Sequence, residues 1–269
     1  MSTNYFFRII SLKDSSDRWT SVTNEFKRLS LTPIKFEAVD GRNANFKIPY
    51  TTEISTNIRC PKKIYDEMTS GEIACFLSHR KCWEEFIKSD FEWALIGEDD
   101  IFLSDKSKKL LISPDWIPSG VDLVQIGSFQ QESLGCYVDK KSIKNLKDGF
   151  TLIKMMKPAS MGSQLYWINK HAAQKALEST SVIYEPVDHF LFDQQDSFCK
   201  HIQVYTLTPF IAYQDFTASS ILTASGRKDI RAKKCERENF FNKIKRHIKS
   251  RYLKITSKKI TRTYIDDTK

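Results

Sequence analysis

Residues 94–103 read Ala-Leu-Ile-Gly-Glu-Asp-Asp-Ile-Phe-Leu, three consecutive acids within an apolar run of the kind that forms a buried strand. A buried carboxylate is costly unless it is paired or binds a cation. Glu98, Asp99 and Asp100 therefore indicate either a solvated turn between two strands or a group that holds a hard divalent ion, which prefers oxygen ligands. The apolar residues on both sides favour the second interpretation, a site for a metal ion and a diphosphate.

The segments before this run alternate between strand and helix patterns. An apolar strand over 5–12 is followed by apolar residues at helical spacing, and a short strand over 36–42 contains the turn signal Asp40-Gly41. A capping box formed by Thr69 and Glu72 predicts a further helix just before the acidic run. Strand, helix and strand at this spacing predict a parallel βαβ unit, with ligand chemistry at the carboxyl ends of its strands.

The same alternation continues towards the C-terminus. Strands are predicted over 121–127, 164–168 and 201–207, the last of them closing the fold, and a helix is predicted over 170–177. The polar stretch 130–157 predicts a hairpin or a flap. The chain has no Gly-x-x-x-x-Gly-Lys-Ser/Thr loop, no Gly-x-Gly-x-x-Gly after the first strand and no Gly-x-Ser-x-Gly elbow. These absences argue against P-loop NTPases, dinucleotide dehydrogenases and α/β-hydrolases.

Composition indicates a globular protein with a substantial core. The chain has 269 residues, of which 41% are hydrophobic and 12% aromatic. Its six cysteines include no Cys-x-x-Cys pair, which predicts reduced thiols and no structural zinc site. Because no apolar run is long enough to cross a bilayer and no secretory leader is visible, a cytoplasmic location is expected.

The positive charge is concentrated near the C-terminus. Residues 227–269 contain 16 Lys or Arg and five acids, whereas the whole chain carries a net charge of +9. Apolar residues recur there at helical spacing, at Phe240, Ile244, Ile248, Tyr252 and Ile255. A basic amphipathic tail, distinct from a domain over 1–226, is therefore expected to bind an anionic membrane surface. The alternative is a helix packed on the domain, and no nucleic-acid partner is expected because no nucleic-acid module is recognisable.

Several segments together carry a family resemblance. They are Ile10-Ser11-Leu12 with Asp17-Arg18, Phe36 to Arg42, Ser70 to His79 with Trp83, Ala94 to Ile101, Gly162 to Tyr166 with Ala172, Ala173 and Leu177, and Pro186-Val187-Asp188. In this order and spacing the chain resembles glycosyltransferase family 25, the bacterial lipooligosaccharide galactosyltransferases and their collagen-modifying relatives, over roughly residues 5–222. Gly97 departs from the pattern, because an aliphatic or acidic residue is expected before the three acids.

The resemblance implies a GT-A-like, Rossmann-type α/β fold, with a mixed, mostly parallel sheet flanked by helices. It also implies an inverting, metal-dependent hexosyltransferase that moves galactose from UDP-galactose, in β linkage, onto a lipooligosaccharide or lipopolysaccharide acceptor. Such an enzyme would be peripheral on the inner face of the cytoplasmic membrane. The alternatives are a transferase that uses UDP-glucose or another nucleotide sugar on a different glycan, and a non-catalytic, membrane-associated protein that binds nucleotide sugars.

Within this reading, the carboxylates have separate roles. Asp100, with Glu98 or Asp99, would hold Mn²⁺ or Mg²⁺ against both phosphates of the donor. Inversion in a single displacement also needs a general base near the acceptor hydroxyl. Asp188 is the first candidate for that base, and Asp193 and Glu185 are alternatives.

Donor-binding residues are expected at the ends of the first strands. They are Ser11, Leu12 and Arg18 for uridine or phosphate, Asp40 and Gly41 for base or ribose, and Ser78, His79 and Asp99 beside them. The alternatives are a plain turn at Asp40-Gly41 and a core role for His79, while Glu72 is explained by its capping position. Gly162, Ser163 and Gln164 are placed on the acceptor side.

Overall fold

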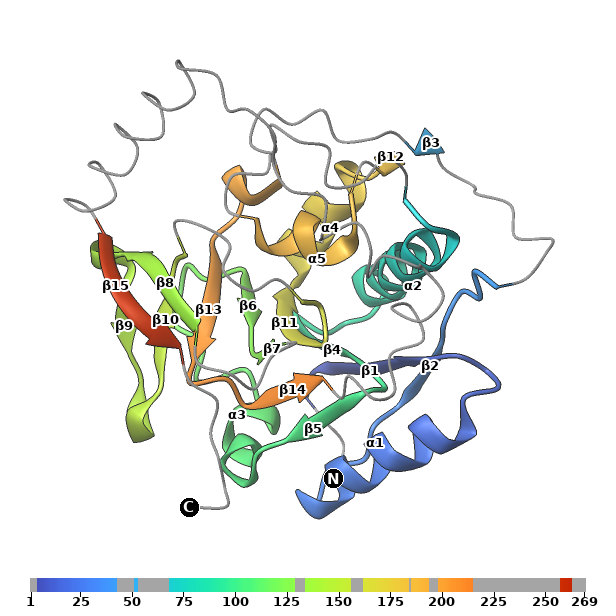
Figure 1. Ribbon diagram of the computed structural model, residues 1–269, viewed down its shortest axis with the longest axis horizontal. Helices are drawn as coiled ribbons and strands as arrows, with labels where there is room; N and C mark the ends of the chain where they lie inside the picture. The colour runs from blue at the N-terminus through green and yellow to red at the C-terminus, as the bar shows by residue number, and fades with distance from the viewer. Residues whose placement is uncertain are drawn as a thin grey trace, which may run out of the picture.

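The computed structural model describes residues 4–42, 51–52, 68–128, 134–155, 162–183, 185–193, 198–214 and 257–262. Its centre is an eight-stranded sheet with the order β2-β1-β4-β11-β6-β13-β10-β9 (Figure 1). These strands are β1 (Phe6–Ser11), β2 (Lys35–Glu37), β4 (Trp93–Glu98), β6 (Leu123–Gln125), β9 (Lys144–Asn145), β10 (Thr151–Ile153), β11 (Leu165–Asn169) and β13 (Val204–Thr208). The pairs β1–β2, β1–β4 and β6–β13 are parallel, and the other neighbours are antiparallel. The predicted mixed α/β fold is confirmed.

Helices cover both faces of this sheet (Figure 1). They are α1 (Ser16–Arg28), α2 (Ser70–Ile87), α3 (Lys108–Leu111), α4 (Lys170–Glu178) and α5 (Val187–Phe192), with 3-10 turns η1 (Asp105–Ser107), η2 (Lys140–Ser142), η3 (Lys147–Gly149) and η4 (Phe198–Lys200). Alternate residues of β1 enter different cores, because successive side chains of a strand point to opposite faces. Phe6 and Ile10 pack with α2, α4 and α5, whereas Phe7 and Ile9 pack with α1 and α3.

The first βαβ unit forms as predicted. Strand β1 leads into α1 and returns as β2, and the pairing of Ile10 with Phe36 places the ends of both strands at the same edge. Helix α2 begins with the predicted capping box, in which Thr69 accepts the backbone N–H of Glu72 and Glu72 accepts that of Thr69. Strand β4 lies beside β1 in parallel, so its acidic end reaches the same edge as well.

The acidic run forms two strands that belong to different sheets. Strand β4 ends at Glu98, and after a turn at Asp99 and Asp100 the chain continues as β5 (Ile101–Leu103). Strand β5 pairs with β14 (Ala212–Gln214), which in turn pairs with β7 (Gly127–Ser128). The prediction that 201–207 is the last strand is therefore wrong. Strand β14 is only three residues long, too short for its alternation to be recognised.

Gly97 is required by the close packing of β4 against its neighbours. A Cβ atom built at this position would lie 2.7 Å from Cδ1 of Leu165, 2.9 Å from the carbonyl oxygen of Gln164 and 3.0 Å from Cδ1 of Ile9. Contacts this short require the backbone or its neighbours to shift, because protein interiors are close-packed. The departure at Gly97 therefore sets the spacing of β4 and β11 immediately before the acids.

The remaining strands lie outside the large sheet. Strand β8 (Leu134–Asp139) pairs antiparallel with β15 (Ser257–Arg262), and β12 (Val182–Ile183) pairs parallel with β3 (Thr51–Thr52). Within the predicted hairpin region, β9 and β10, which belong to the large sheet, are antiparallel neighbours joined through η3. The predicted amphipathic helix lies outside the described residues, whereas β15 shows that part of the tail is a strand. None of the helices in the described part of the chain has the length and hydrophobicity that a bilayer crossing requires.

Candidate active site

A cavity of about 260 Å³ opens at the carboxyl ends of β1, β2 and β4. Four segments surround it: the end of β1, the loop after β2, the first two turns of α2 and the acidic end of β4. Its lining residues are Ile10, Ser11, Leu12, Arg18, Ala38, Val39, Asp40, Gly41, Arg42, Thr69, Ser70, Gly71, Ala74, Cys75, Ser78, Glu98 and Asp99. Of the predicted donor-binding residues, only His79 is absent from this set. Ligands of α/β proteins bind at such strand ends.

Arg18 neutralises part of the acidic turn. Its guanidinium contacts the carboxylate of Asp99 and lies 3.0 Å from Oδ2 of Asp100. The side chain of Gln214, from β14, also donates to Oδ2 of Asp100 over 2.9 Å. Asp99 and Asp100 are buried. Arg18, which lines the cavity, is thus paired with both acids. The sequence did not predict this pairing.

The three acids titrate in different surroundings. Burial raises the pKa of Asp99 despite the nearby charge of Arg18. Burial, reinforced by the negative charge of Glu98, raises the pKa of Asp100 to about 7. Burial also acts on Glu98, but the imidazole of His79 and the hydroxyl of Ser163 outweigh it and lower the pKa of Glu98. Negative charge at this turn is therefore only partly compensated by the protein.

Glu98 is held by side chains from two other elements. Ser163 donates to its Oε1 over 2.6 Å, and Nε2 of His79 lies 3.5 Å from the same oxygen. Nδ1 of His79 lies 2.8 Å from the hydroxyl of Tyr166, which also accepts a hydrogen bond from the indole of Trp83. His79 is fully buried. Its imidazole lies between the core and the cavity wall, in contact with Glu98.

The loop after β2 forms the cavity wall opposite the acidic turn. Arg42 donates to both Asp40 and Asp14, and its hydrogen bond with Asp40 lowers the pKa of that carboxyl to about 2. Ser78 accepts the backbone N–H of Val39 over 2.8 Å, which fastens the loop to α2. Gly41 lies against α2, because a Cβ atom there would be 2.4 Å from the carbonyl oxygen of Ser70. Gly41 is thus explained by close packing as well as by its turn.

Comparison with known proteins decides the family. The model of glycosyltransferase family 25, described as an LPS biosynthesis protein, matches residues 1–191. The chain belongs to glycosyltransferase family 25. It is 30% identical over 117 residues to the lipooligosaccharide biosynthesis protein lic2B of Haemophilus influenzae, a match that covers 44% of this chain and 40% of that protein.

Two further relatives also match over only part of their own length. The lipooligosaccharide biosynthesis protein lex-1 of Haemophilus influenzae is 26% identical over 170 residues, covering 60% of this chain and 56% of that protein. Procollagen galactosyltransferase 2 of Homo sapiens is 32% identical over 106 residues, covering 39% of this chain and 17% of that protein. This chain therefore spans about half the length of the Haemophilus relatives that it matches.

The candidate general bases of this family member lie at both ends of the short helix α5. Asp188 is in its first turn, and its charge is close enough to raise the pKa of the Cys75 thiol, after burial and the charge of Glu98. Asp193 ends the helix, and Glu185 precedes it. Among the residues that the structure describes, none of these three acids lines the cavity. Asp188 acts electrostatically on Cys75, which lines the cavity.

The acidic turn has a free oxygen that fits a divalent cation. Oδ1 of Asp100 is buried and has no hydrogen-bond partner among the described residues. A buried carboxylate oxygen without a partner is unfavourable in the protein alone, and Mg²⁺ and Mn²⁺ prefer such oxygen ligands. The predicted ligands Glu98 and Asp100 and their neighbour Asp99 come from one turn. The chemistry of these residues therefore fits the predicted metal.

Sequence reasoning did not identify several residues of this site. Gln214 contacts Asp100 from a strand 114 residues away in the chain, and no local pattern indicates it. Ser163, which is predicted on the acceptor side, also donates to Glu98. Cys75, for which the sequence predicts only a reduced thiol, lines the cavity. Its position four residues before His79 on one helix was an available signal, since such pairs share a face.

Proposed function

We propose that this family member is an inverting, metal-dependent hexosyltransferase that moves galactose from UDP-galactose, in β linkage, onto a lipooligosaccharide or lipopolysaccharide acceptor. The observation that carries the proposal is the cavity at the carboxyl ends of three parallel strands, with the acidic turn in its wall. The names of the Haemophilus relatives support the acceptor, and that of the human relative supports galactose.

The cavity has two chemically different walls, which suit the two parts of a nucleotide-sugar donor. The loop with Asp40 and Gly41 offers a carboxylate for base or ribose. The opposite wall, with Glu98, Asp99 and Arg18, receives the diphosphate. Helix α2 begins at the cavity, and the partial positive charge of a helix N-terminus favours phosphate there. The donor would therefore lie across the ends of β1 and β4.

The chemistry assigned to this chain is a single displacement. The acceptor oxygen forms a bond to the anomeric carbon as the bond from that carbon to the phosphate oxygen breaks, and UDP leaves with the electron pair. Asp188 takes the proton from the acceptor hydroxyl. Asp100 and Glu98, with Asp99 beside them, would hold Mn²⁺ or Mg²⁺. When bound, such an ion supplies electrostatic stabilisation of the departing diphosphate.

A donor screen tests this proposal. With Mn²⁺ present, we expect UDP-galactose to be consumed faster than other UDP-sugars, because transfer needs the matching sugar. Transfer also needs the negative charge of the acidic turn. Removal of the metal with EDTA should stop consumption, and Mn²⁺ added in excess should restore it. Mass spectrometry of released UDP and of a lipooligosaccharide acceptor provides the measurement. UDP-glucose as the preferred donor would correct the sugar, and binding without any turnover would favour a non-catalytic nucleotide-sugar-binding protein.

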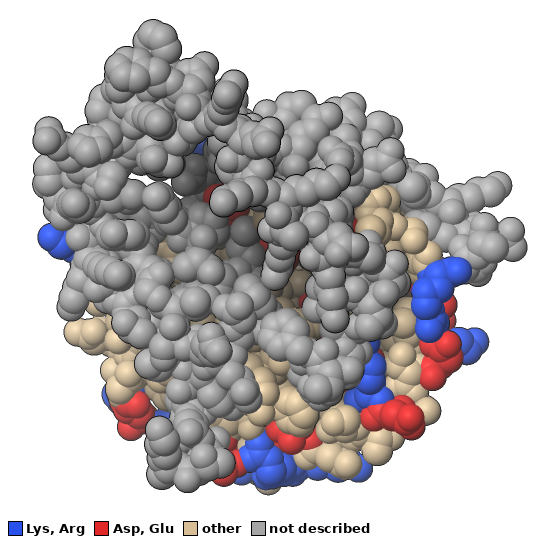
Figure 2. Space-filling view, in the orientation of Figure 1, with Lys and Arg blue, Asp and Glu red and all other residues tan. Residues whose placement is uncertain are grey.

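We further propose that the basic segment 227–269 holds the enzyme on the anionic inner face of the cytoplasmic membrane. On the face shown in Figure 2, the Lys, Arg, Asp and Glu side chains of the described residues alternate along the lower edge, and neither sign forms a continuous patch there. The charge excess belongs to the tail, with its 16 basic residues. Polybasic segments are attracted to anionic lipid by about 1 kcal/mol per Lys or Arg near the surface.

A charge-reduced tail tests the membrane proposal without removing β15. Replacing Lys243, Lys245, Arg246 and Lys249 by Gln should reduce binding to vesicles that contain phosphatidylserine, because the electrostatic attraction is lost. Raising the salt concentration should weaken binding of the unchanged protein in the same way. Vesicle co-sedimentation gives the measurement, with neutral phosphatidylcholine vesicles as the control. Equal binding of both proteins to anionic vesicles would contradict a membrane role for the tail.

A further inference from the structure

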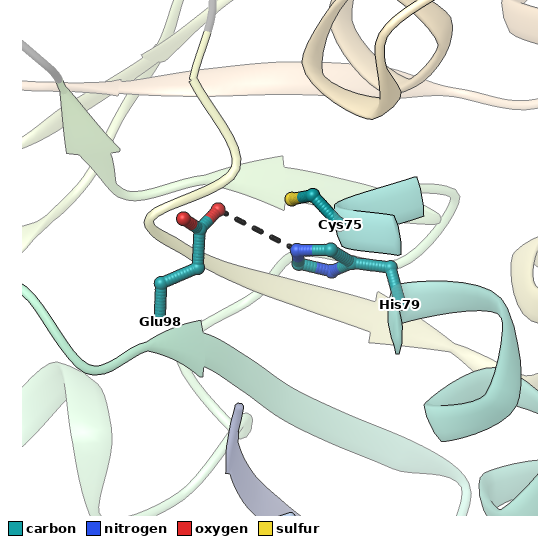
Figure 3. A group of neighbouring side chains, drawn as sticks. All are labelled: Cys75, His79 and Glu98. Carbon is teal, nitrogen blue, oxygen red and sulfur yellow. Dashed lines mark ion pairs between the residues drawn. The ribbon is translucent and has the colours of Figure 1, made fainter. Parts of the chain in front are cut away.

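A second group of potential metal ligands lies beside the acidic turn. Cys75 and His79 project from α2 towards Glu98, which comes from the end of β4 (Figure 3). One ligand atom from each of the three residues lies within 4.8 Å of the other two. Cys75 and His79 are one helical turn apart, so the helix itself brings their side chains to one face. These three side chains are called the thiol–imidazole–carboxylate group below.

The imidazole in this group is arranged as metal-binding histidines are. His79 is fully buried, and its Nε2 has no hydrogen-bond partner among the described residues, lying 3.5 Å from Oε1 of Glu98. Its other nitrogen, Nδ1, is fixed at 2.8 Å by the hydroxyl of Tyr166. Ligating histidines generally use one nitrogen for the metal while a hydrogen bond to the other fixes the ring orientation. Nε2 thus faces the Glu98 carboxylate at ion-pair distance without forming a hydrogen bond, and with the Cys75 thiol beside them this arrangement points to a cation.

The geometry points to a site for a thiophilic divalent cation such as Zn²⁺, and we propose that Cys75, His79 and Glu98 bind it through sulfur, nitrogen and oxygen. Binding replaces the proton of the Cys75 thiol, which leaves to solvent. Three protein ligands leave one position of a tetrahedral zinc ion open. Cys75 and Glu98 both line the cavity, so a zinc ion held by them would be accessible from it.

This site differs in chemistry from the carboxylates that are assigned to the diphosphate. A soft thiolate with an imidazole selects zinc or cobalt, whereas carboxylates alone suit Mg²⁺ and Mn²⁺. The two sites share only Glu98, and the inference needs neither a donor nor an acceptor. Asp100 belongs to the carboxylate site alone. Cation binding to the thiol–imidazole–carboxylate group is therefore testable in protein without transferase activity.

Cobalt spectroscopy of the reduced full chain tests the inference, with Co²⁺ alone as the probe. We expect one equivalent of Co²⁺ to produce a thiolate-to-cobalt charge-transfer band and intense tetrahedral bands, all removed by Zn²⁺. Cys75→Ser should abolish the charge-transfer band. Tyr166→Phe should weaken binding about 10-fold, because it removes the partner of Nδ1. The matched control is Cys82→Ala, since Cys82 is a buried free thiol on the same helix. That variant and Asp100→Asn should both keep the band.

A second measurement uses the unaltered protein and does not depend on the folding of a variant. Zn²⁺ should protect Cys75 from iodoacetamide, with the modified peptide quantified by mass spectrometry. Weak octahedral cobalt absorption would show carboxylate binding only and would overturn the inference. A charge-transfer band that persists in folded Cys75→Ser, or alkylation of Cys75 that Zn²⁺ does not change, would overturn it as well. Loss of transfer in Asp100→Asn with the cobalt band intact would support both sites independently.

Discussion

Asp100→Asn is expected to lower the rate of sugar transfer by about 10²–10³-fold, the loss typical of removing one electrostatic contact to a developing charge. The substitution removes the charge of a buried carboxylate whose Oδ1 has no partner among the described residues. Asparagine retains an oxygen that accepts the amide of Gln214, and Arg18 keeps its contact with Asp99. The fold should therefore persist while the hold on the metal and the diphosphate weakens.

The measurement is the initial rate of transfer at several Mn²⁺ concentrations, together with the thermal unfolding temperature. Asp115→Asn is the matched control, because Asp115 is exposed and lies outside both the acidic turn and the lining of the cavity. It removes the same charge and should leave the rate unchanged. A rate for Asp100→Asn within threefold of the unaltered enzyme, with unchanged response to EDTA, would show that Asp100 does not serve the metal.

The parts of this fold that sequence predicts are those with strong local patterns. Strand β1, helix α1 and strand β2 follow from apolar periodicity, and α2 follows from the Thr69–Glu72 box. The acidic turn also stood out, because charges interrupt an apolar run. What the pattern could not reveal is that β5 leaves the main sheet for β14. An apolar run indicates that a strand is buried, but it does not indicate which strand will pair with it.

The site shows the same division between local and distant determinants. Most predicted donor residues line one cavity because parallel strands bring their carboxyl ends together. The partners of the acids come from elsewhere in the chain. Arg18, which is predicted to contact phosphate or uridine, is also paired with Asp99 and Asp100, and Gln214 reaches Asp100 from β14. Such pairings depend on tertiary packing, which no single segment encodes.

Gly97 departs from the family pattern, and close packing explains why. In sequence it is an unexpected residue before three acids. In the structure its missing side chain allows Leu165, Gln164 and Ile9 to approach the β4 backbone. This close approach brings β11 next to β4. Strand β11 begins just after Ser163, the residue that donates to Glu98. The glycine and the hydroxyl contact are therefore two aspects of one close strand pairing.

Asp188→Asn is expected to lower the turnover number by about 10²–10⁴-fold, the usual contribution of a general base. Asparagine cannot take the proton of the acceptor hydroxyl, so transfer slows. Donor binding should stay unchanged, because Asp188 is not among the described residues that line the cavity. The measurements are the turnover number with saturating donor and acceptor, and the affinity for UDP by calorimetry.

Asp193→Asn provides the comparison, because the two acids lie at opposite ends of α5. Asp188 sits on the side that influences Cys75 electrostatically, and Cys75 lines the cavity beside Glu98. A base there can approach an acceptor that enters over the sugar, whereas the metal-binding acids remain on the diphosphate side. Normal turnover in Asp188→Asn with loss in Asp193→Asn would transfer the role to the other end of the helix. Normal turnover in both variants would leave Glu185 as the remaining candidate.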